Sequence, residues 1–284
     1  MRRRFLIVDV FTRRPFYGNP VAVVLDAEGL DPKAMQRIAQ WTNLSETTFC
    51  LPASIDGADY QLRIFTPRSE LPFAGHPTLG SVHALRSVGR LTDRSTAFQE
   101  CGVGRVPIQR DQDGWTFRLP PSRSSALAPE SVVALEQAVG VALSETAPKL
   151  IDVGPKWVVA RLSSPQQLQG LTPNLDLLAR FEHSLGATGV TLFAASQSDS
   201  ADIEVRSFAP SQGVPEDPVC GSGNGAVAAF RRDVDSVTGL AGYCAAQGRS
   251  VGRDGEVRIR YADPDEIWVG GECVVAADGF LNCD

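Results

Sequence analysis

The chain has 284 residues, of which 43% are hydrophobic and 21% are charged, and its formal net charge is −6 at pH 7. This length and apolar content suit one large or two medium domains with buried cores, and they exclude a disordered chain or a coiled coil. The acidic net charge argues against nucleic-acid binding. No basic run in the sequence is longer than Arg2-Arg3-Arg4. Residues 5–10 are too short an apolar segment for a signal peptide or membrane helix, so we expect a cytoplasmic protein without a membrane partner.

The first residues predict a strand hairpin followed by a helix. Residues 5–11 and 21–25 have the composition of strands, and Gly18-Asn19-Pro20 between them is typical of a turn. Residues 31–42 predict a helix, because Asp31-Pro32 supplies an N-cap acid and a first-turn proline ahead of apolar residues at helical spacing.

A third strand is predicted over residues 44–51. Side chains alternate along a strand, so Glu46 and Thr48 should face away from Phe49. Glu46 is therefore expected on the face opposite the apolar one.

The next strand, residues 60–65, is followed by a loop that leads to Gly75 and to a helix ending near Leu85. His76 then lies in the first turn of that helix, where the helix dipole disfavours the charged form. Such a position suits a neutral imidazole that can accept or pass a proton near pH 7. The alternative is a capping or surface histidine.

The midpoint of the chain carries a polar, proline-rich segment, residues 120–125, which predicts a linker. We therefore expect one domain over residues 1–120 and a second over 121–272, with a C-terminal strand at about 273–284 that is a candidate to return to the first domain. In the second half, the sequence predicts helices at 130–139 and 175–185 and strands at 156–162 and 189–193.

The two halves carry an internal repeat. Arg63-Ile64-Phe65-Thr66-Pro67 leads to Gly75-His76-Pro77, and Arg206-Ser207-Phe208-Ala209-Pro210 leads to Gly221-Ser222-Gly223. The two arginines are 143 positions apart in a chain of 284. This spacing predicts two halves built on one supersecondary plan.

The two repeated halves do not carry the same acid and base residues at matching positions. Aligning Phe193 with Phe49 places Val190 at the position of Glu46, and Ala74 falls at the position of Cys220. A symmetric two-base racemase would need a matched acid or base from each half. We therefore expect an asymmetric site with one main base.

The segment from Glu216 to Ala226 has the highest density of reactive side chains. It places an acid, a thiol, a hydroxyl and three glycines ahead of the apolar run 226–230, which predicts a buried helix with an anion-binding N-terminus. A carboxylate or an enolate could bind there; the alternative is a glycine-rich turn capped by Asp217 or Ser222.

The six cysteines form no C-x-x-C pair and have no zinc spacing with the three histidines, so we expect reduced thiols and no metal. Cys220 alone lies beside the expected helix N-terminus. That position should lower its pKa and could make the thiol reactive.

Taken together, several motifs resemble the PhzF-like family of phenazine-biosynthesis isomerases, within the diaminopimelate-epimerase fold. They are, in chain order, Phe11 with Gly18-Asn19-Pro20-Val21-Ala22-Val23, Ser45-Glu46-Thr47, Phe65-Thr66-Pro67, Gly75-His76-Pro77-Thr78-Leu79, and Glu216-Asp217-Pro218-Val219 with Gly221-Ser222. The resemblance implies an α+β fold with two pseudo-symmetric domains, each a rolled, mainly antiparallel sheet around a central helix. It also implies a site in the cleft between them, a homodimer and an isomerase that uses no cofactor.

The resemblance also implies roles for individual residues. It places the catalytic base on Glu46, the proton-relay histidine on His76, and an aspartate and a serine of the site on Asp217 and Ser222. Substrate-binding positions are expected at Asn19, Gly75, Cys220 and Gly221. The family chemistry moves a proton between carbons of a small unsaturated carboxylic acid, such as a dihydro-hydroxyanthranilate.

The chain departs from the family at Cys220, where the family has threonine. Cys220-Gly221-Ser222-Gly223 resembles the second thiol motif of the diaminopimelate and proline epimerases, but the first thiol of that pair would fall at Ala74. A two-thiol epimerase is thus disfavoured. An epimerase or racemase using Cys220, a dehydratase and a non-catalytic small-molecule-binding protein remain as alternatives.

Overall fold

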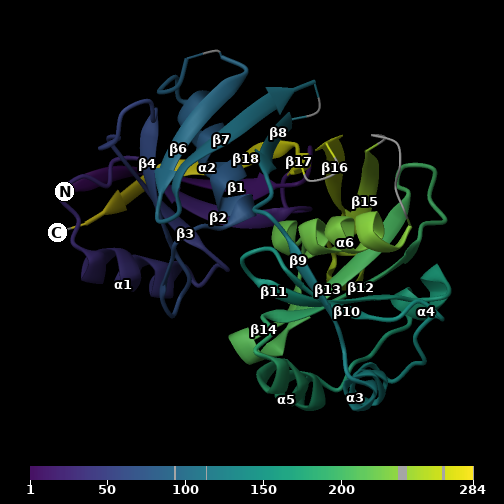
Figure 1. Cartoon of the computed structure of the whole chain (residues 1–284). Helices are drawn as coiled ribbons and strands as arrows, with labels where there is room; N and C mark the ends of the chain where they lie inside the picture. The colour runs from purple at the N-terminus through teal and green to yellow at the C-terminus, as the bar shows by residue number, and fades with distance from the viewer. Residues whose placement is uncertain (93, 113, 236–241, 264–265, 284) are drawn as a thin grey trace. The chain divides into compact units, whose positions relative to one another are not determined.

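This computed structural model describes residues 1–92, 94–112, 114–235, 242–263 and 266–283. Their contacts divide the chain into two compact units: unit 1 is Met1–Arg118 with Gly270–Asp284, and unit 2 is Leu119–Val269. The first boundary falls beside the proline-rich segment that starts at Pro120. Figure 1 shows the course of the chain through the two units.

Unit 1 is a mainly antiparallel sheet rolled around helix α2 (Gly75–Ser87), which contacts strands on several sides. Helix α1 (Pro32–Thr42) packs on the outer face of that sheet. The strands are β1 (Arg2–Val10), β2 (Asn19–Val24), β3 (Thr47–Leu51), β4 (Tyr60–Phe65), β5 (Glu70–Leu71), β6 (Thr96–Cys101), β7 (Gly104–Asp111), β8 (Gly114–Arg118) and β18 (Cys273–Asn282).

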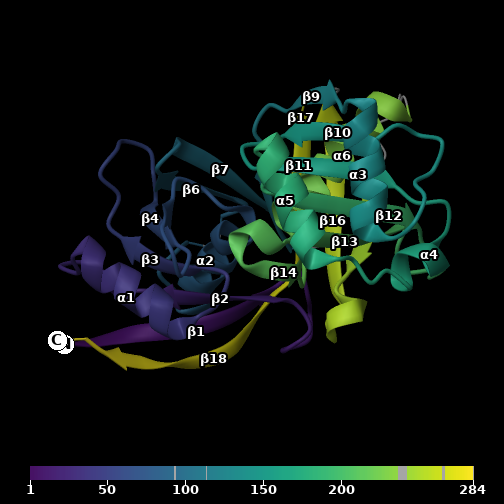
Figure 2. The same ribbon diagram turned by 90° about the horizontal axis from the view of Figure 1, so that it is seen from below.

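The last strand, β18, belongs to the sheet of unit 1. It pairs antiparallel with β1 from Arg2 opposite Asn282 to Val10 opposite Cys273. Figure 2 shows these two strands, and the two ends of the chain, side by side. The first unit is therefore completed by the C-terminal residues of the chain.

Unit 2 repeats this plan around helix α6 (Gly221–Val234), which contacts strands on several sides. Its outer face is covered by α3 (Pro129–Val139), α4 (Pro165–Gln169) and α5 (Leu175–Leu185). The strands are β9 (Arg123–Ala126), β10 (Lys149–Asp152), β11 (Lys156–Arg161), β12 (Gly189–Ala195), β13 (Ile203–Ala209), β14 (Val214–Asp217), β15 (Tyr243–Gln247), β16 (Gly255–Asp263) and β17 (Glu266–Gly271), the last of which leads back into unit 1.

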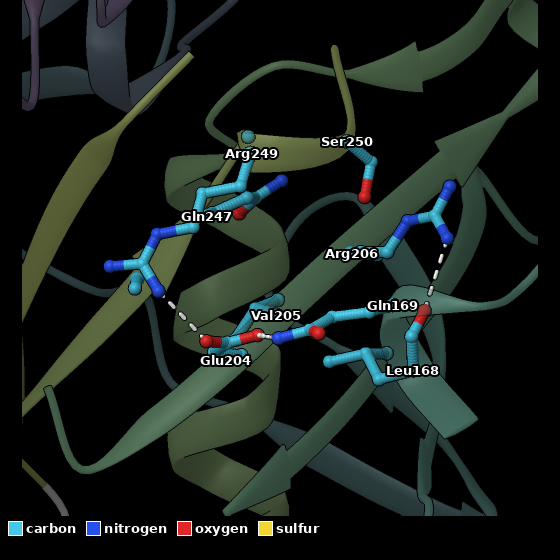
Figure 3. Close-up of a pocket in the computed structure, with 10 residues that line it drawn as sticks. Leu168, Gln169, Glu204, Val205, Arg206, Gln247, Arg249 and Ser250 are labelled. Atoms are coloured by element: carbon cyan, nitrogen blue, oxygen red, sulfur yellow. Dashed lines mark hydrogen bonds and ion pairs between the residues drawn. The ribbon is translucent and has the colours of Figure 1, made fainter. Parts of the chain in front are cut away.

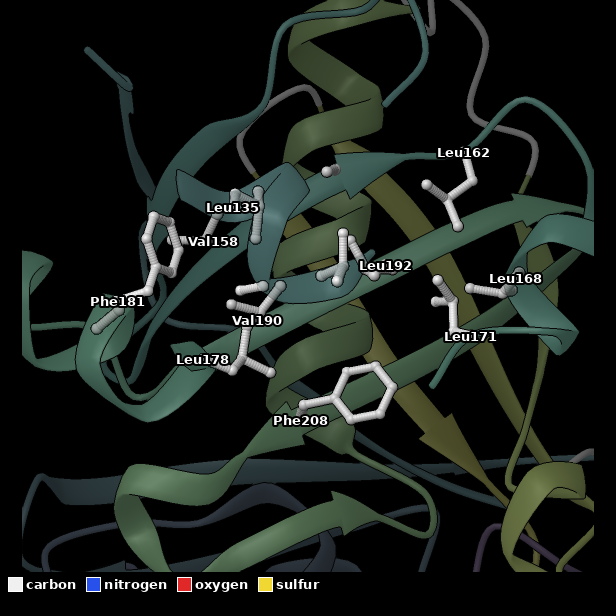
Figure 4. Packing of buried hydrophobic residues seen from close by; sticks show 14 of the residues in the cluster. Leu135, Val158, Leu162, Leu168, Leu171, Leu178, Phe181, Val190, Leu192 and Phe208 are labelled. Carbon is white, nitrogen blue, oxygen red and sulfur yellow. The ribbon is translucent and has the colours of Figure 1, made fainter. Parts of the chain in front are cut away.

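A hydrophobic cluster joins the outer helices of unit 2 to its sheet. Figure 4 shows Leu178 and Phe181 of α5 beside Val190 of β12 and Phe208 of β13. These side chains are almost completely removed from solvent. Burial of apolar area on this scale is the main stabilising contribution to such a layer.

The internal repeat of the sequence is present in the tertiary structure. Arg63 on β4 forms an ion pair with Glu70 on β5 at 2.7 Å, and Arg206 on β13 forms one with Glu216 on β14, also at 2.7 Å. Each pair joins equivalent strands of its own unit. The fold class expected from the sequence is confirmed: α+β, with two similar halves, each a rolled sheet around a central helix.

The strand register corrects one alignment between the halves. Thr47 pairs with Phe65 in unit 1, and Val190 pairs with Phe208 in unit 2. Val190 therefore corresponds to Thr47, and the counterpart of Glu46 is Gly189. The alignment of Phe193 with Phe49 was wrong by one residue, and a one-residue slip moves a side chain to the opposite face of the sheet.

We predict that Val190→Ala lowers the free energy of unfolding by about 1–3 kcal/mol, because it removes two methyl groups from the buried cluster and leaves a cavity. Urea-induced unfolding of the full chain measures this change in the free energy of unfolding. Val133→Ala on α3 is the matched control, since Val133 is 53% exposed and should cost much less. Equal effects of the two substitutions would contradict the assigned packing.

Candidate active site

The first group of predicted site residues is built on the start of α2. The helix begins at Gly75, after Ala74 in an extended conformation, and Pro77 lies in its first turn, where its missing N–H costs nothing. Gly75 has a packing requirement, since a Cβ atom there would lie 2.4 Å from Cζ of Phe117. Only glycine lets the first turn approach Phe117 this closely.

His76 is the second residue of α2, and its side chain is 7% exposed. Its ring hydrogen-bonds the backbone carbonyl of Pro20. Because Nε2 makes no hydrogen bond within the described ranges, the donor to Pro20 is Nδ1. Burial lowers the pKa of His76 to about 3, although the bond to Pro20 opposes this shift. The ring is thus neutral at pH 7, mainly through burial and not through the helix dipole that the sequence suggested.

Glu46 immediately precedes β3 and faces α2. Its Oε2 atom lies 3.4 Å from Nε2 of His76. Thr48, on the same face of the strand, lies 2.8 Å from Ser81 of α2 between hydroxyl oxygens. The strand alternation seen in the sequence thus directs both side chains toward the central helix. Asn19 is fully buried at the start of β2, next to Pro20.

The contact between Glu46 and His76 has a chemical consequence. With Nδ1–H donated to Pro20, the Nε2 atom of neutral His76 presents a lone pair toward the carboxyl oxygen. Two lone pairs repel unless a proton lies between them. This geometry can therefore pass one proton between the carboxyl group and the imidazole.

The second group of site residues is built on the start of α6. Cys220 is the N-cap residue, and its Sγ atom accepts the backbone N–H of Gly223 at 3.2 Å. The amide of Gln247 braces the same turn: its Oε1 accepts the N–H of Cys220 at 3.1 Å, and its Nε2 donates to the carbonyl of Asp217 at 3.0 Å. Asn224 donates to Gln247 Oε1 at 2.7 Å.

The unusual Gly223-Asn224-Gly225 run has a steric explanation. A Cβ atom on Gly223 would lie 2.8 Å from the hydroxyl of Ser207, and one on Gly225 would lie 2.5 Å from Leu119. Both glycines let α6 pack closely against its neighbours. Gly221 and Ser222, the first two helical residues, have backbone N–H groups without partners inside the helix.

The titration behaviour of Cys220 differs from the sequence expectation. Burial raises the pKa of its thiol well above the usual value, and the adjacent Asp217 carboxylate raises it further. The hydrogen bonds from the Ser222 hydroxyl and the Gly223 N–H lower the pKa but do not outweigh this desolvation. The expectation of a lowered pKa was wrong, and the thiol is protonated at pH 7.

Asp217 lies next to this thiol at the end of β14. Burial raises the pKa of Asp217 to about 6, while hydrogen bonds from Cys220 and from the Val219 N–H lower it and the charge of Glu216 raises it. A carboxyl group with this pKa changes its charge close to neutral pH.

The hydroxyl of Ser222 lies between two partners. The indole Nε1–H of Trp157 donates to Ser222 Oγ at 3.1 Å, and Cys220 Sγ lies 3.6 Å from the same oxygen. Sequence reasoning missed Trp157 and Gln247. Neither belongs to a motif, and each is far from α6 along the chain.

The eight predicted residues thus form two groups. Asn19, Glu46, Gly75 and His76 lie in unit 1, and Asp217, Cys220, Gly221 and Ser222 lie in unit 2. Within each unit the key side chains are in contact. Action of the two groups on one substrate stays a prediction.

A cavity in unit 2 is not a substrate site. Figure 3 shows it lined by Glu204, Arg206, Gln247 and Arg249, and its volume is about 20 Å³, room for about one water molecule. Its charges are paired, with Arg249 2.8 Å from Glu204. The cavity shares Gln247 with the turn before α6.

Within the described ranges, no three His, Cys, Asp or Glu side chains gather in a way that could hold a metal ion. None of the helices that the structure describes is both long and apolar enough to cross a membrane.

Comparison with known proteins decides the family. The sequence model of the PhzC-PhzF family, described as "Phenazine biosynthesis-like protein", matches residues 8–279. The chain belongs to this family. It is 38% identical to Antisense-enhancing sequence 1 of Schizosaccharomyces pombe, with 97% of both chains covered. It is 37% identical to the trans-2,3-dihydro-3-hydroxyanthranilate isomerase of Pseudomonas aeruginosa, with 79% of this chain and 78% of that one covered.

Solved structures show the same PhzF fold. A PhzF-family protein of Bacillus anthracis matches with a TM-score of 0.90 at 24% identity over the whole of both chains. A hydroxyproline epimerase of Agrobacterium vitis matches with a TM-score of 0.66 at 15% identity, with 99% of this chain and 92% of that one covered. The family match and the isomerase relative make this PhzF-type chain an enzyme of the isomerase class. The solved structures show that its fold is shared with epimerases.

We predict that Asp217→Asn changes the pH dependence of stability. The folded pKa of Asp217, about 6, lies above its ordinary value of 3.8, so ionisation disfavours the folded state. The wild type should therefore lose stability as the pH rises from about 4 to about 6, relative to the asparagine variant, with a constant difference above that range. Urea unfolding at several pH values measures this difference.

Asp56→Asn removes an exposed carboxylate of unit 1 and serves as the control. A difference between Asp217→Asn and wild type that is independent of pH, or that shrinks as the pH rises, would contradict the raised pKa.

Proposed function

We propose that the protein isomerises a small unsaturated cyclic carboxylic acid carrying amino and hydroxy groups, by moving a proton from one carbon to another with Glu46 as the general base. The supporting observation is the 3.4 Å contact between Glu46 Oε2 and Nε2 of the neutral, buried His76. The substrate class comes from the name of the Pseudomonas aeruginosa relative, a trans-2,3-dihydro-3-hydroxyanthranilate isomerase.

In this mechanism, the Glu46 carboxylate removes a proton from an sp³ carbon adjacent to the unsaturated system. The electron pair of the broken C–H bond moves into the conjugated system, and the proton moves to the carboxyl group. Re-protonation at a different carbon completes the isomerisation. Atoms and electrons balance without an oxidant, a reductant or a cofactor.

His76 suits the role of a relay for this proton. Its Nε2 lone pair faces the Glu46 oxygen, so it can accept the proton directly from the carboxyl group. Its lowered pKa makes the buried imidazolium short-lived. A group that accepts a proton but does not retain it favours transfer to the second carbon.

The start of α6 suits the binding of a carboxylate or of developing negative charge. Gly221 and Ser222 offer backbone N–H groups at the positive end of the helix dipole, and Ser222 adds a hydroxyl. Asp217 changes its charge near pH 6, so its carboxyl group can donate or accept a hydrogen bond with an amino or hydroxy group of the substrate. We propose that this group and the Glu46–His76 pair act on the same substrate molecule.

We predict that Glu46→Gln lowers kcat by about 10²–10⁴-fold while KM changes much less, because the amide keeps the shape of the side chain but cannot accept the carbon-bound proton. Turnover of trans-2,3-dihydro-3-hydroxyanthranilate and uptake of deuterium from solvent measure the effect. Glu100→Gln is the control, since Glu100 is a buried carboxylate of unit 1 that binds Ser54.

Normal deuterium uptake by Glu46→Gln would transfer the base role to another group. Failure of the wild type to exchange deuterium into this acid or into any small amino or hydroxy acid would contradict isomerase chemistry of this class as a whole.

We predict that Cys220→Ser keeps most of the activity. The thiol is protonated at pH 7, and its counterpart in unit 1 is Ala74, so the thiol pair of the two-thiol epimerases is absent. The serine hydroxyl can still cap the N–H of Gly223. A fall in kcat of about a thousandfold or more would instead favour an epimerase that uses the Cys220 thiol.

A further inference from the structure

The indole of Trp157 contacts the start of α6 in unit 2. Trp157 is 3% exposed near the start of β11, and its Nε1–H donates to Ser222 Oγ at 3.1 Å. It pairs across the sheet with Gly189 of β12. The indole is thus held between the sheet and the first turn of α6.

Gly189 leaves the space that the indole requires. A Cβ atom at Gly189 would lie 2.5 Å from Cζ3 of Trp157 and 2.3 Å from the carbonyl oxygen of Phe208. The strand register makes Gly189 the counterpart of Glu46. The chain therefore excludes a side chain in unit 2 at the position that carries the base in unit 1.

The two central helices also differ at the position that faces this strand residue in unit 1. Ser222 is the second residue of α6, as His76 is the second residue of α2. His76 faces the carboxyl group of Glu46, whereas Ser222 accepts a hydrogen bond from Trp157. In unit 2, a hydrogen bond of fixed direction from Trp157 to Ser222 therefore takes the place that the Glu46–His76 pair, which can exchange a proton, has in unit 1.

The direction of this bond restricts the Ser222 hydroxyl. An indole nitrogen can only donate, so Ser222 Oγ must accept, and its own proton must point away from Trp157. The nearby thiol does not reverse this arrangement. The S–H of Cys220 donates to Asp217, so Cys220 Sγ, 3.6 Å from Ser222 Oγ, can only accept a weak hydrogen bond from the serine. Ser222 is thus held as a donor.

We propose that Trp157 is a positioning residue that holds the Ser222 hydroxyl as a hydrogen-bond donor to the oxyanion that develops on the substrate carboxylate in the transition state. This role rests on the proposed isomerase function. Trp157 acts through Ser222 and does not itself exchange a proton.

The test is a double-mutant cycle of Trp157→Phe and Ser222→Ala, measured on trans-2,3-dihydro-3-hydroxyanthranilate. Trp157→Phe removes the N–H and keeps an aromatic ring, and it should lower kcat about 10-fold, the scale of one hydrogen bond, with KM changed less than about threefold. In the Ser222→Ala background, the same substitution should have little further effect, because its target is gone.

Trp268→Phe is the matched control. Trp268 is a buried indole of unit 2, and its N–H donates to Glu266 at 2.6 Å. It should leave kcat near the wild-type value. Equal losses in the two phenylalanine variants, or an undiminished effect of Trp157→Phe in the Ser222→Ala background, would overturn the proposal.

A second readout needs no substrate. In ¹⁵N-labelled protein, the indole proton of Trp157, identified by its loss in Trp157→Phe, should exchange slowly with solvent, and Ser222→Ala should accelerate its exchange relative to that of Trp268. Unchanged exchange would overturn the proposal even if no substrate is turned over. Accelerated exchange in a protein that isomerises nothing would support the hydrogen bond and overturn only the proposed function.

Discussion

The burial of His76 at the start of α2 is the constraint on which the chemistry of unit 1 depends. Burial keeps the imidazole neutral, and the carbonyl of Pro20 takes its Nδ1 proton. Only Nε2 then remains to interact with Glu46, 3.4 Å away. The surrounding residues serve this arrangement, since Gly75 lets the helix start lie against Phe117, and Pro20 follows the buried Asn19.

The two units place different side-chain pairs at the start of their central helices. Each places a central helix so that its second residue meets the sheet, but unit 1 brings a carboxyl group to an imidazole and unit 2 brings an indole to a hydroxyl. The difference depends on one strand position, which is Glu46 in unit 1 and Gly189 in unit 2. One half can thus move a proton, while the other is suited to hold charge.

Much of the fold could be predicted from local patterns in the sequence. The repeated Arg-x-Phe-x-Pro strands and the glycine that starts each central helix indicated two similar halves, and strand alternation placed Glu46 on the face opposite Phe49. In the structure, that face is the one toward α2. These features depend on neighbouring residues and on the period of each element. Local sequence is sufficient to show them.

Three features of the site could not be predicted in this way. The register of β12 was missed by one residue, because Phe193 is an equally plausible match for Phe49 until the partner strand is known. The raised pKa of Cys220 depends on burial, which local sequence does not report. The bonds of Trp157 and Gln247 to the start of α6 join residues that are distant in the chain, and no motif marks them.

The most direct test of this account is the protonation state of the His76 ring, followed by ¹⁵N NMR between pH 5 and pH 8, with His76→Gln to assign its signals among the three histidines. We predict a neutral ring with its proton on Nδ1 throughout this range, because burial lowers its pKa to about 3. A ring that titrates near its ordinary pKa, or one that carries its proton on Nε2, would contradict the proposed relay.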